Sequence, residues 1–411
     1  MSATSFADLI NTFAAISDPA CADGVQRLGF SALERQSHQV FVEFMENLGL
    51  SVWTDAVGNT IAQYPGAQPL SAIGVGSHLD SVYRAGQYDG IAGVVTAMLV
   101  AERLTQEAVT TRHPIRFVAF ATEEGARFGQ ACIGSRLVTG RTSVQDLQRL
   151  KDSDGVSAYQ AMKDCGLRPD DLAEALWNPA DWDSFLELHI EQGPALHSQG
   201  IDIGVVNLIS GSCRFLVTFT GIASHSGGTP MHLRKDAFMA AAEFALAAEA
   251  IALDSEHHGT RVTIGQVSVE PGSITTIPGK CTLSVDVRDI DSVRQRETAR
   301  VLVHLASSSG ERRGIGVETQ YLSDVAPAFL SNKIQTALAD AARSVGASHT
   351  YMYSGASHDA QIVSSICDTG MVFVPSLNGG VSHSPRELSR IDDLEMGTKV
   401  VYEAILRLDR K

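Results

Sequence analysis

The stretch from Ile73 to Val94, IGVGSHLDSVYRAGQYDGIAGV, decides how this chain is organised. It begins with a short apolar run that is typical of a buried strand, and His78 and Asp80 stand where that run ends. A glycine-containing loop then leads to Asp89, and we expect an apolar helix rich in Gly and Ala from Gly90. A histidine and two carboxylates at a strand end predict a cluster of metal ligands. The alternative is a histidine held in an ordinary hydrogen-bond network.

Two further apolar runs show the same pattern of a strand followed by ionisable side chains. Residues 115–121 form the second predicted strand, and the adjacent acids Glu123 and Glu124 follow it. The third run, SFLELHI, ends at His189. Helical segments separate these strands, which favours an α/β fold with a mostly parallel sheet. Because such sheets place their sites at the carboxyl ends of strands, we expect these side chains to meet.

The rest of this α/β region consists of predicted helices, a hairpin and one more strand. A hairpin with a Gly-Asn turn is expected in SVWTDAVGNTIAQYPG, and the strand MVFVP leads to a loop that carries His383. A polar helical segment without a chemical signal covers about residues 140–180. The other helices are predicted at residues 5–20, 31–49, 90–106, 332–345 and 391–408.

The pattern changes near Ser210, where strands begin to alternate polar and apolar residues. The order of elements from there is βαββαβ, which is typical of a ferredoxin-like α+β fold. We therefore predict a metal-binding catalytic domain made of residues 1–209 and 325–411. Residues 210–324 would form an inserted lid and dimerisation domain.

Composition limits the possible classes of protein. The 411 residues suffice for one large or two ordinary domains, and 44% hydrophobic residues provide an ample core. The net charge is −15, from 32 Lys and Arg against 47 Asp and Glu, and no basic patch stands out. Nucleic acid is therefore a poor partner.

Cysteine usage and apolar runs indicate the compartment. Six cysteines lie scattered without a CxxC pair, which favours reduced thiols in a cytoplasmic protein. The N-terminal MSATSFADLINTFAAISD contains no Lys or Arg and predicts an amphipathic helix instead of a signal peptide. No apolar run reaches the length of a membrane span, so no membrane partner is expected.

The candidate ligands are more specific for a metal site as a set than as single residues. An isolated Glu-Glu pair favours two solvated loop acids, and His189 or His383 alone favours a structural histidine. Together they give three histidines and two carboxylates beside Asp89, the mixture of a two-metal hydrolytic site. One glutamate could then bind metal while its neighbour acts as general base on a water.

Other polar residues could contact a substrate. His225, in GIASHSGGTP, could donate to a developing oxyanion, although its glycines and proline are also typical of a simple turn. Arg288 suits a substrate carboxylate, but could instead pair with Asp286 or Asp289. His358, in SGASHDA, is a candidate for the rim of the site or for the support of a ligand.

These motifs resemble the di-metal aminoacylase/carboxypeptidase-like hydrolases, and most closely their N-carbamoyl-L-amino-acid hydrolase and allantoate amidohydrolase (hydantoinase/carbamoylase) branch. The resemblance covers nearly the whole chain. It rests on the motifs GSHLDSV, YDGIAGV, ATEEGARFG, ELHIEQGP, ASHSGGTPM, DVRD, SGASHDA and GVSHSP, in this order. ELHIEQGP is similar to the carbamoylase branch because it has His where peptidase branches usually have a carboxylate.

The resemblance implies two divalent metal ions per subunit, Zn²⁺ or else Mn²⁺, Co²⁺ or Ni²⁺. It implies one metal held by His78, Asp89 and His189, and a second held by Asp89, Glu124 and His383. The resemblance also implies that Glu123 is the general base and that Asp80 orients His78. It implies that the substrate is contacted by Gln192, His225 and Arg288. Because the equivalent of His225 typically reaches the partner's site, a homodimer through residues 210–324 is implied.

One position departs from the family. Thr275, in PGSITTIPG, stands where the family usually has Asn, and it lacks the paired donor and acceptor of an amide.

From the resemblance we expect a hydrolase of an N-carbamoyl-L-amino acid or related ureido acid that releases amino acid, ammonia and carbon dioxide. The alternatives are an allantoate amidohydrolase or 3-ureidopropionase, an aminoacylase or dipeptidase with the same metals, and an inactive binding or scaffold protein.

Overall fold

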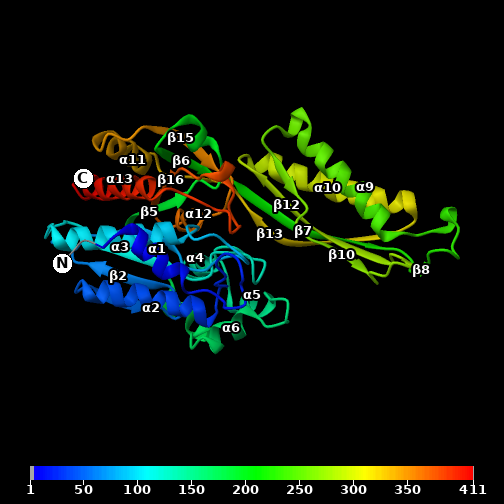
Figure 1. The fold of residues 1–411 in the computed structure, drawn as a ribbon, viewed down its shortest axis with the longest axis horizontal. Coiled ribbons are helices and arrows are strands. Elements are labelled where there is room, and N and C mark those ends of the chain that lie inside the picture. Colours follow the sequence, from blue (N-terminus) through cyan, green and yellow to red (C-terminus); the bar gives the residue numbers. More distant parts are fainter. Residues whose placement is uncertain (1–3, 411) are drawn as a thin grey trace. The chain divides into compact units, whose positions relative to one another are not determined.

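The computed structural model describes residues 4–410, and the chain divides into two compact units (Figure 1). Unit 1 comprises Met1–Leu208 and Phe329–Lys411, and unit 2 comprises Ile209–Ala328. Unit 2 is thus an insertion in the chain of unit 1. The boundary expected at residue 324 falls inside the last strand of unit 2, which continues to Val325.

Unit 1 is built on a mixed nine-stranded sheet with the order β1-β2-β4-β3-β5-β16-β6-β14, in which β15 also pairs with β6. Its central strands β4, β3, β5 and β16 run parallel, whereas β2 and β6 are antiparallel to their neighbours. The predicted α/β class with a mostly parallel central sheet is confirmed. The strands are β1 (Ser51–Thr54), β2 (Thr60–Tyr64), β3 (Ala72–His78), β4 (Ile115–Phe120), β5 (Trp182–Ile190), β6 (Ile203–Ile209), β14 (Ala328–Phe329), β15 (His349–Ser354) and β16 (Asp368–Val374).

Helices cover both faces of this sheet, because its central strands are apolar on both sides. In β4, Phe117 packs into one core and Val118 into the other, and in β5 Leu186 and Phe185 divide in the same way. Such strands appear as continuous apolar runs in the sequence. The helices of unit 1 are α1 (Phe6–Ala14), α2 (Ala32–Asn47), α3 (Ile91–Gln106), α4 (Ile133–Val138), α5 (Val144–Arg149), α6 (Ala158–Asp164), α7 (Leu172–Ala175), α8 (Ala195–Gln199), α11 (Asn332–Ser344), α12 (Asp359–Val363) and α13 (Ile391–Asp409).

Two helix predictions need correction. The helix expected over residues 5–20 ends at Ala14, because Pro19 disfavours a helical Asp18, whose backbone N–H donates instead to the carbonyl of Gln26. The polar segment at 140–180 is not one helix but the short helices α5, α6 and α7. By contrast, α2 ends close to the predicted place, with Gly49 in the left-handed conformation at φ 78°.

Unit 2 has the βαββαβ order, with its antiparallel strands in the order β10-β12-β7-β13 and β9 also paired with β12. Cys213, Phe215, Val217 and Phe219 alternate along β7 and pack against α9 and α10, which lie side by side over one face (Figure 1). The run RVTIGQVSVE forms two short strands, β9 and β10, which residues 264–266 separate. The elements are β7 (Gly211–Thr220), α9 (Ala237–Leu253), β9 (Arg261–Thr263), β10 (Val267–Glu270), β12 (Lys280–Asp289), α10 (Ser292–Arg313) and β13 (Gly316–Val325), with the short strands β8 (Ser224–His225) and β11 (Thr276–Ile277).

The apolar character of the helices and the state of the cysteines bear on the class of protein. Within residues 4–410, no helix has both the length and the apolar character that crossing a bilayer requires. All six cysteines are free thiols, and three of them, Cys132, Cys213 and Cys281, are buried.

Close packing between β3 and β4 generates the first prediction. A Cβ atom on Gly76 would lie 1.9 Å from the backbone oxygen of Val118, so Gly76→Ala must push the two strands apart. We expect the substitution to lower the free energy of unfolding by about 3 kcal/mol, measured by urea unfolding followed by circular dichroism. Gly265→Ala is the control, since its Cβ would lie 3.7 Å from the nearest atom, the Ser284 hydroxyl. Equal unfolding midpoints for the two variants would contradict the prediction.

Candidate metal centre

The carboxyl ends of three parallel strands bring the predicted ligands together. His78 is the last residue of β3, and His189 is the last residue but one of β5. Glu123 and Glu124 follow β4, whose last residue, Phe120, pairs with His78. The strand-end clustering expected for an α/β sheet is therefore present in unit 1.

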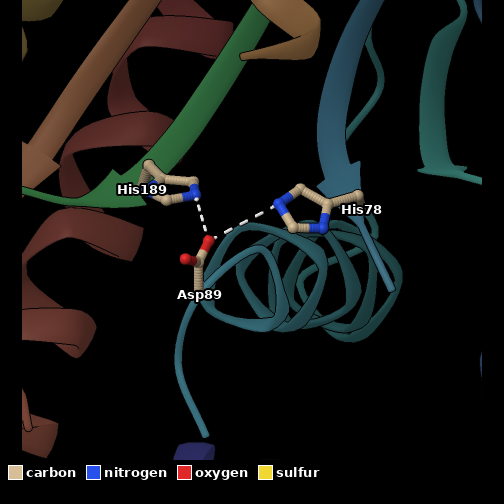
Figure 2. Close-up of side chains that lie close together, drawn as sticks. All are labelled: His78, Asp89 and His189. Atoms are coloured by element: carbon tan, nitrogen blue, oxygen red, sulfur yellow. Dashed lines mark ion pairs between the residues drawn. The ribbon is translucent and has the colours of Figure 1, made fainter. Parts of the chain in front are cut away.

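Asp89 is the centre of the cluster, and its two carboxylate oxygens face different partners. Figure 2 shows Asp89, just before α3, between the rings of His78 and His189. Its Oδ1 lies 3.0 Å from Nε2 of His189 and 3.6 Å from Nε2 of His78. Its Oδ2 lies 3.2 Å from Nε2 of His383, and that same nitrogen lies 3.6 Å from Oε2 of Glu124.

The result is two groups of three potential ligands that share one carboxylate. In each group the ligand atoms lie within 4.8 Å of one another. The groups are His78, Asp89 and His189, and Asp89, Glu124 and His383. Glu123 lies beside the first group, with Oε2 at 3.9 Å from Nε2 of His78. These are the two sets that the family resemblance implied.

Asp80 connects the strand ends through three contacts. Its Oδ1 accepts a hydrogen bond from the backbone N–H of Glu123 at 2.8 Å, and its Oδ2 accepts one from Glu124 at 3.0 Å. Oδ1 also lies 3.3 Å from Nδ1 of His78. Because Nδ1 faces Asp80, Nε2 of His78 faces the other ligands. Asp80 therefore positions one histidine and two glutamates.

Burial excludes the alternative of two solvated loop acids. Glu123 and Glu124 are each only 6% exposed. Gly90, at φ 69°, allows α3 to begin directly against a ligand, since a Cβ there would lie 2.3 Å from Cε1 of His78. His383 is the exposed member, with 53% of its side chain accessible. The centre therefore opens to solvent on the His383 side.

Opposite charges and burial together shift the pKa values of the ligands. The charge of Glu124 raises the pKa of His383 to about 10. Burial lowers the pKa of His78, but its hydrogen bonds with Asp80 and Asp89 outweigh burial and raise that pKa well above its ordinary value. Burial and the charge of Asp89 raise the pKa of Glu124 well above its ordinary range. Neighbouring carboxylates therefore favour the charged form of the two histidines, whereas burial and like charge favour the neutral form of Glu124.

The residues fit a pair of divalent cations. Oε1 of Glu124 is buried and has no hydrogen-bond partner, although such a group normally has one. Imidazole nitrogens and carboxylate oxygens are also the donors that Zn²⁺ and related ions take. A cation at each group would compensate the buried carboxylates and satisfy this oxygen.

The structure places the remaining predicted residues of unit 1 close to the ligands. Nε2 of Gln192 donates to Oδ2 of Asp89 at 2.7 Å, so this side chain contacts the shared carboxylate. His358 is 2% exposed, and its ring packs edge-on against the ring of His189 at 4.5 Å between centroids. His358 thus supports a ligand in this structure, and its contact with substrate stays a prediction.

His225, Thr275 and Arg288 belong to unit 2. Nδ1 of His225 accepts hydrogen bonds from the backbone N–H groups of Gly227 and Gly228, at 3.1 and 3.0 Å. A neutral imidazole held in this way carries its proton on Nε2. The carbonyl of Thr275 accepts from the N–H of Ser226 next to His225. The ion pair considered for Arg288 is present, from Nε to Asp286 at 2.9 Å.

Sequence reasoning missed one residue that holds the centre together. Oε1 of Glu387 accepts from the backbone N–H groups of Tyr88 and Asp89, and its Oε2 accepts from the hydroxyl of Ser382. Glu387 thereby fixes the loop before Asp89 to the loop that carries His383. The available signal was its place four residues after His383 in HSPRE, a short loop that could return toward the site.

The sequence and fold of this chain are similar to those of known hydrolases. The model of peptidase family M20/M25/M40 matches residues 74–407. The chain is 38% identical to an N-carbamoyl-L-amino acid amidohydrolase of Geobacillus stearothermophilus, over 94% of this chain and 93% of the relative. It is 34% identical to a ureidoglycolate hydrolase of Arabidopsis thaliana, over 97% of this chain and 85% of the relative. An amidase of the hydantoinase/carbamoylase family from Burkholderia vietnamiensis superposes with a TM-score of 0.89 at 30% identity, covering 98% and 96% of the two chains.

The contacts of Asp80 generate a prediction on metal affinity. In Asp80→Asn, an amide N–H₂ replaces one acceptor oxygen and opposes a backbone N–H of Glu123 or Glu124. We expect affinity for Zn²⁺ or Mn²⁺ to fall by about 10- to 100-fold in titration calorimetry of the metal-free protein. Asp154→Asn is the control, because Asp154 is exposed. Unchanged affinity in Asp80→Asn would show that these contacts do not position the ligands.

Proposed function

The chain belongs to peptidase family M20/M25/M40, whose hydrolases act on carbon–nitrogen bonds, and we propose that it hydrolyses the ureido C–N bond of an N-carbamoyl-L-amino acid or related ureido acid. The observation that carries the proposal is the pair of ligand groups sharing Asp89, with the buried carboxyl of Glu123 beside them. The similarity to an N-carbamoyl-L-amino acid amidohydrolase supports the class of substrate.

Two divalent cations would be held by His78, Asp89 and His189, and by Asp89, Glu124 and His383. When bound, they would polarise the ureido carbonyl and lower the pKa of a water molecule. The mixed N and O ligands suit Zn²⁺, Mn²⁺, Co²⁺ or Ni²⁺.

Glu123 moves the proton in the proposed reaction. Its carboxylate takes a proton from the attacking water and returns it to the leaving amine when the C–N bond breaks. Burial raises the pKa of Glu123, and the charge of His78 opposes this effect, which suits a group that both accepts and releases a proton. The products are the free amino acid, ammonia and carbon dioxide.

Unit 2 would supply the contacts with the substrate. The tautomer of His225, with its proton on Nε2, makes it a ready hydrogen-bond donor to the developing oxyanion. The guanidinium of Arg288 suits the substrate carboxylate. We propose that residues 209–328 act as a lid that brings these two side chains to the centre, as domain closure does in other enzymes.

A binding or scaffold protein is disfavoured by the same side chains. A protein that kept the fold but lost catalysis would lack a constraint on the ligand groups. Here both groups of three ligands and the adjacent carboxyl of Glu123 are assembled in unit 1.

We also propose a homodimer formed through unit 2. The outer side of α9 exposes Phe238, Leu246 and Leu253, which are 42%, 70% and 80% accessible and lie on one side of the helix. β13 is an edge strand with the exposed apolar residues Tyr321 and Leu322. An exposed apolar helix face and an edge strand with exposed apolar residues are each typical of an interface with a second copy. The free state of all six cysteines supports a cytoplasmic location.

The third prediction tests the proposed reaction by ammonia release. The metal-loaded enzyme should release ammonia from at least one of four kinds of ureido compound: N-carbamoyl-L-amino acids, allantoate, 3-ureidopropionate and ureidoglycolate. It should not release free amine from N-acetyl amino acids or dipeptides. Glu123→Gln should bind both metals yet lose about 10²- to 10⁴-fold in kcat.

Glu174→Gln is the matched control, since this acid lies in α7 and pairs with Arg168 at the surface. Turnover of the acetyl or dipeptide compounds alone would replace the proposal by an aminoacylase or dipeptidase. Normal kcat in a metal-loaded Glu123→Gln protein would remove the general base from the mechanism.

The fourth prediction concerns the dimer. Leu246→Glu places a charge in the apolar face of α9 and should convert the protein to monomers at micromolar concentration, as measured by sedimentation velocity. Leu176→Glu is the control, because Leu176 is 49% exposed in unit 1 and outside the proposed interface. A dimer that survives Leu246→Glu would exclude this face.

A further inference from the structure

The carboxyl group of Glu123 has a second buried neighbour that no motif indicated. Sγ of Cys132 lies 3.0 Å from Oε1 of Glu123, and the two residues are 1% and 6% exposed. An ionised carboxylate only accepts hydrogen bonds, so the thiol is the donor. Burial and the charge of Glu123 raise the pKa of the Cys132 thiol well above its ordinary value, which keeps the hydrogen on sulfur at neutral pH.

Backbone hydrogen bonds hold this thiol at a fixed place. The N–H of Cys132 donates to the carbonyl of Glu123 at 2.6 Å, and the next N–H, of Ile133, donates to the carbonyl of Thr122 at 2.9 Å. Cys132 has φ 60°, a conformation that costs energy in a residue other than glycine. The segment after β4 and the start of α4 are therefore bound to each other, which holds the backbone of Cys132 beside that of Glu123.

The start of α4 is also fixed from its other side. The hydroxyl of Ser135 donates to Oδ1 of Asp359 at 2.6 Å, and both residues are fully buried. Asp359 begins α12, which packs against β5, the strand that carries His189. The position of the thiol is thus set by the same strand ends that position the metal ligands.

We infer that Cys132 is a positioning residue that binds Oε1 of Glu123 and thereby presents Oε2 to the reacting water. Oε2 is the oxygen that lies toward the ligands, 3.9 Å from Nε2 of His78. Without the thiol, the torsions of a glutamate side chain would allow other rotamers in this charged pocket. The inference rests on the proposed function, because it concerns the presentation of the general base.

The test compares two variants that share the backbone conformation at residue 132. Cys132→Ala removes the donor and should lower kcat about tenfold, as expected for one hydrogen bond to a charged group. KM and the content of both metals should stay unchanged, because Cys132 contacts no predicted metal ligand. Cys132→Ser keeps a donor and should restore kcat to within about threefold of the wild type.

Cys281→Ala is the matched control. Cys281 is also fully buried, but it lies in the core of unit 2. This variant measures the effect of losing a buried thiol in itself and should leave kcat unchanged. Full kcat in Cys132→Ala, an equal loss in the Ser variant, or a loss of metal would each overturn the inference.

An infrared measurement tests the contact without changing Cys132. The S–H stretching bands of metal-loaded wild type and Glu123→Gln are compared, and one band should shift because a neutral amide accepts a weaker hydrogen bond than a carboxylate. Superimposable bands would overturn the inference. A wild type that hydrolyses no ureido compound would instead overturn the proposed function, and that result is read from the wild-type assay alone.

Discussion

Repulsion among buried carboxylates is the constraint on which this centre depends. Asp80, Asp89, Glu123 and Glu124 are each at most 7% exposed at the carboxyl end of one sheet. Buried carboxylates close to one another raise each other's pKa values, and burying their charges costs free energy unless positive charge compensates them. Three imidazoles provide part of that charge, and the two shared ligand groups define where cations would provide the rest. The buried carboxylates at this end of the sheet are therefore what the proposed cations would compensate.

A layer of hydrogen bonds behind the ligands sustains this arrangement. Asp80 and Glu387 each accept two backbone N–H groups of the loops that carry ligands, and a third buried acid, Glu34, accepts the N–H and hydroxyl of Thr122. Thr122 has φ 54°, which is costly for a β-branched residue, and His383 has φ 53°. Strained residues of this kind persist where the surroundings determine them completely. These hydrogen bonds therefore fix the backbone of the ligand loops in place, including strained residues such as Thr122.

Sequence predicted the parts of the structure that depend on local pattern or on specific motifs. The apolar runs that became β3, β4 and β5 were clear because both faces of the sheet are buried, and the ligand groups followed from the motifs at their ends. The strands β6, β14 and β15 were not predicted. β14 has only two residues, β15 (HTYMYS) contains no apolar run, and the apolar run of β6 (IGVVNLI) has no ionisable residue at its end. Glu387 and Cys132 were missed for a different reason. Their roles depend on which loops approach each other in space, and a single sequence contains no periodic signal for that.

His383 has a consequence for the biogenesis of the protein. It follows the whole of unit 2 in the chain, whereas its partners Asp89 and Glu124 precede unit 2. A ribosome therefore has to synthesise all of unit 2 before the second ligand group can exist. The second group of the proposed centre therefore forms only after unit 2 has been synthesised, and a chain that stops within unit 2 would have at most one of the two ligand groups.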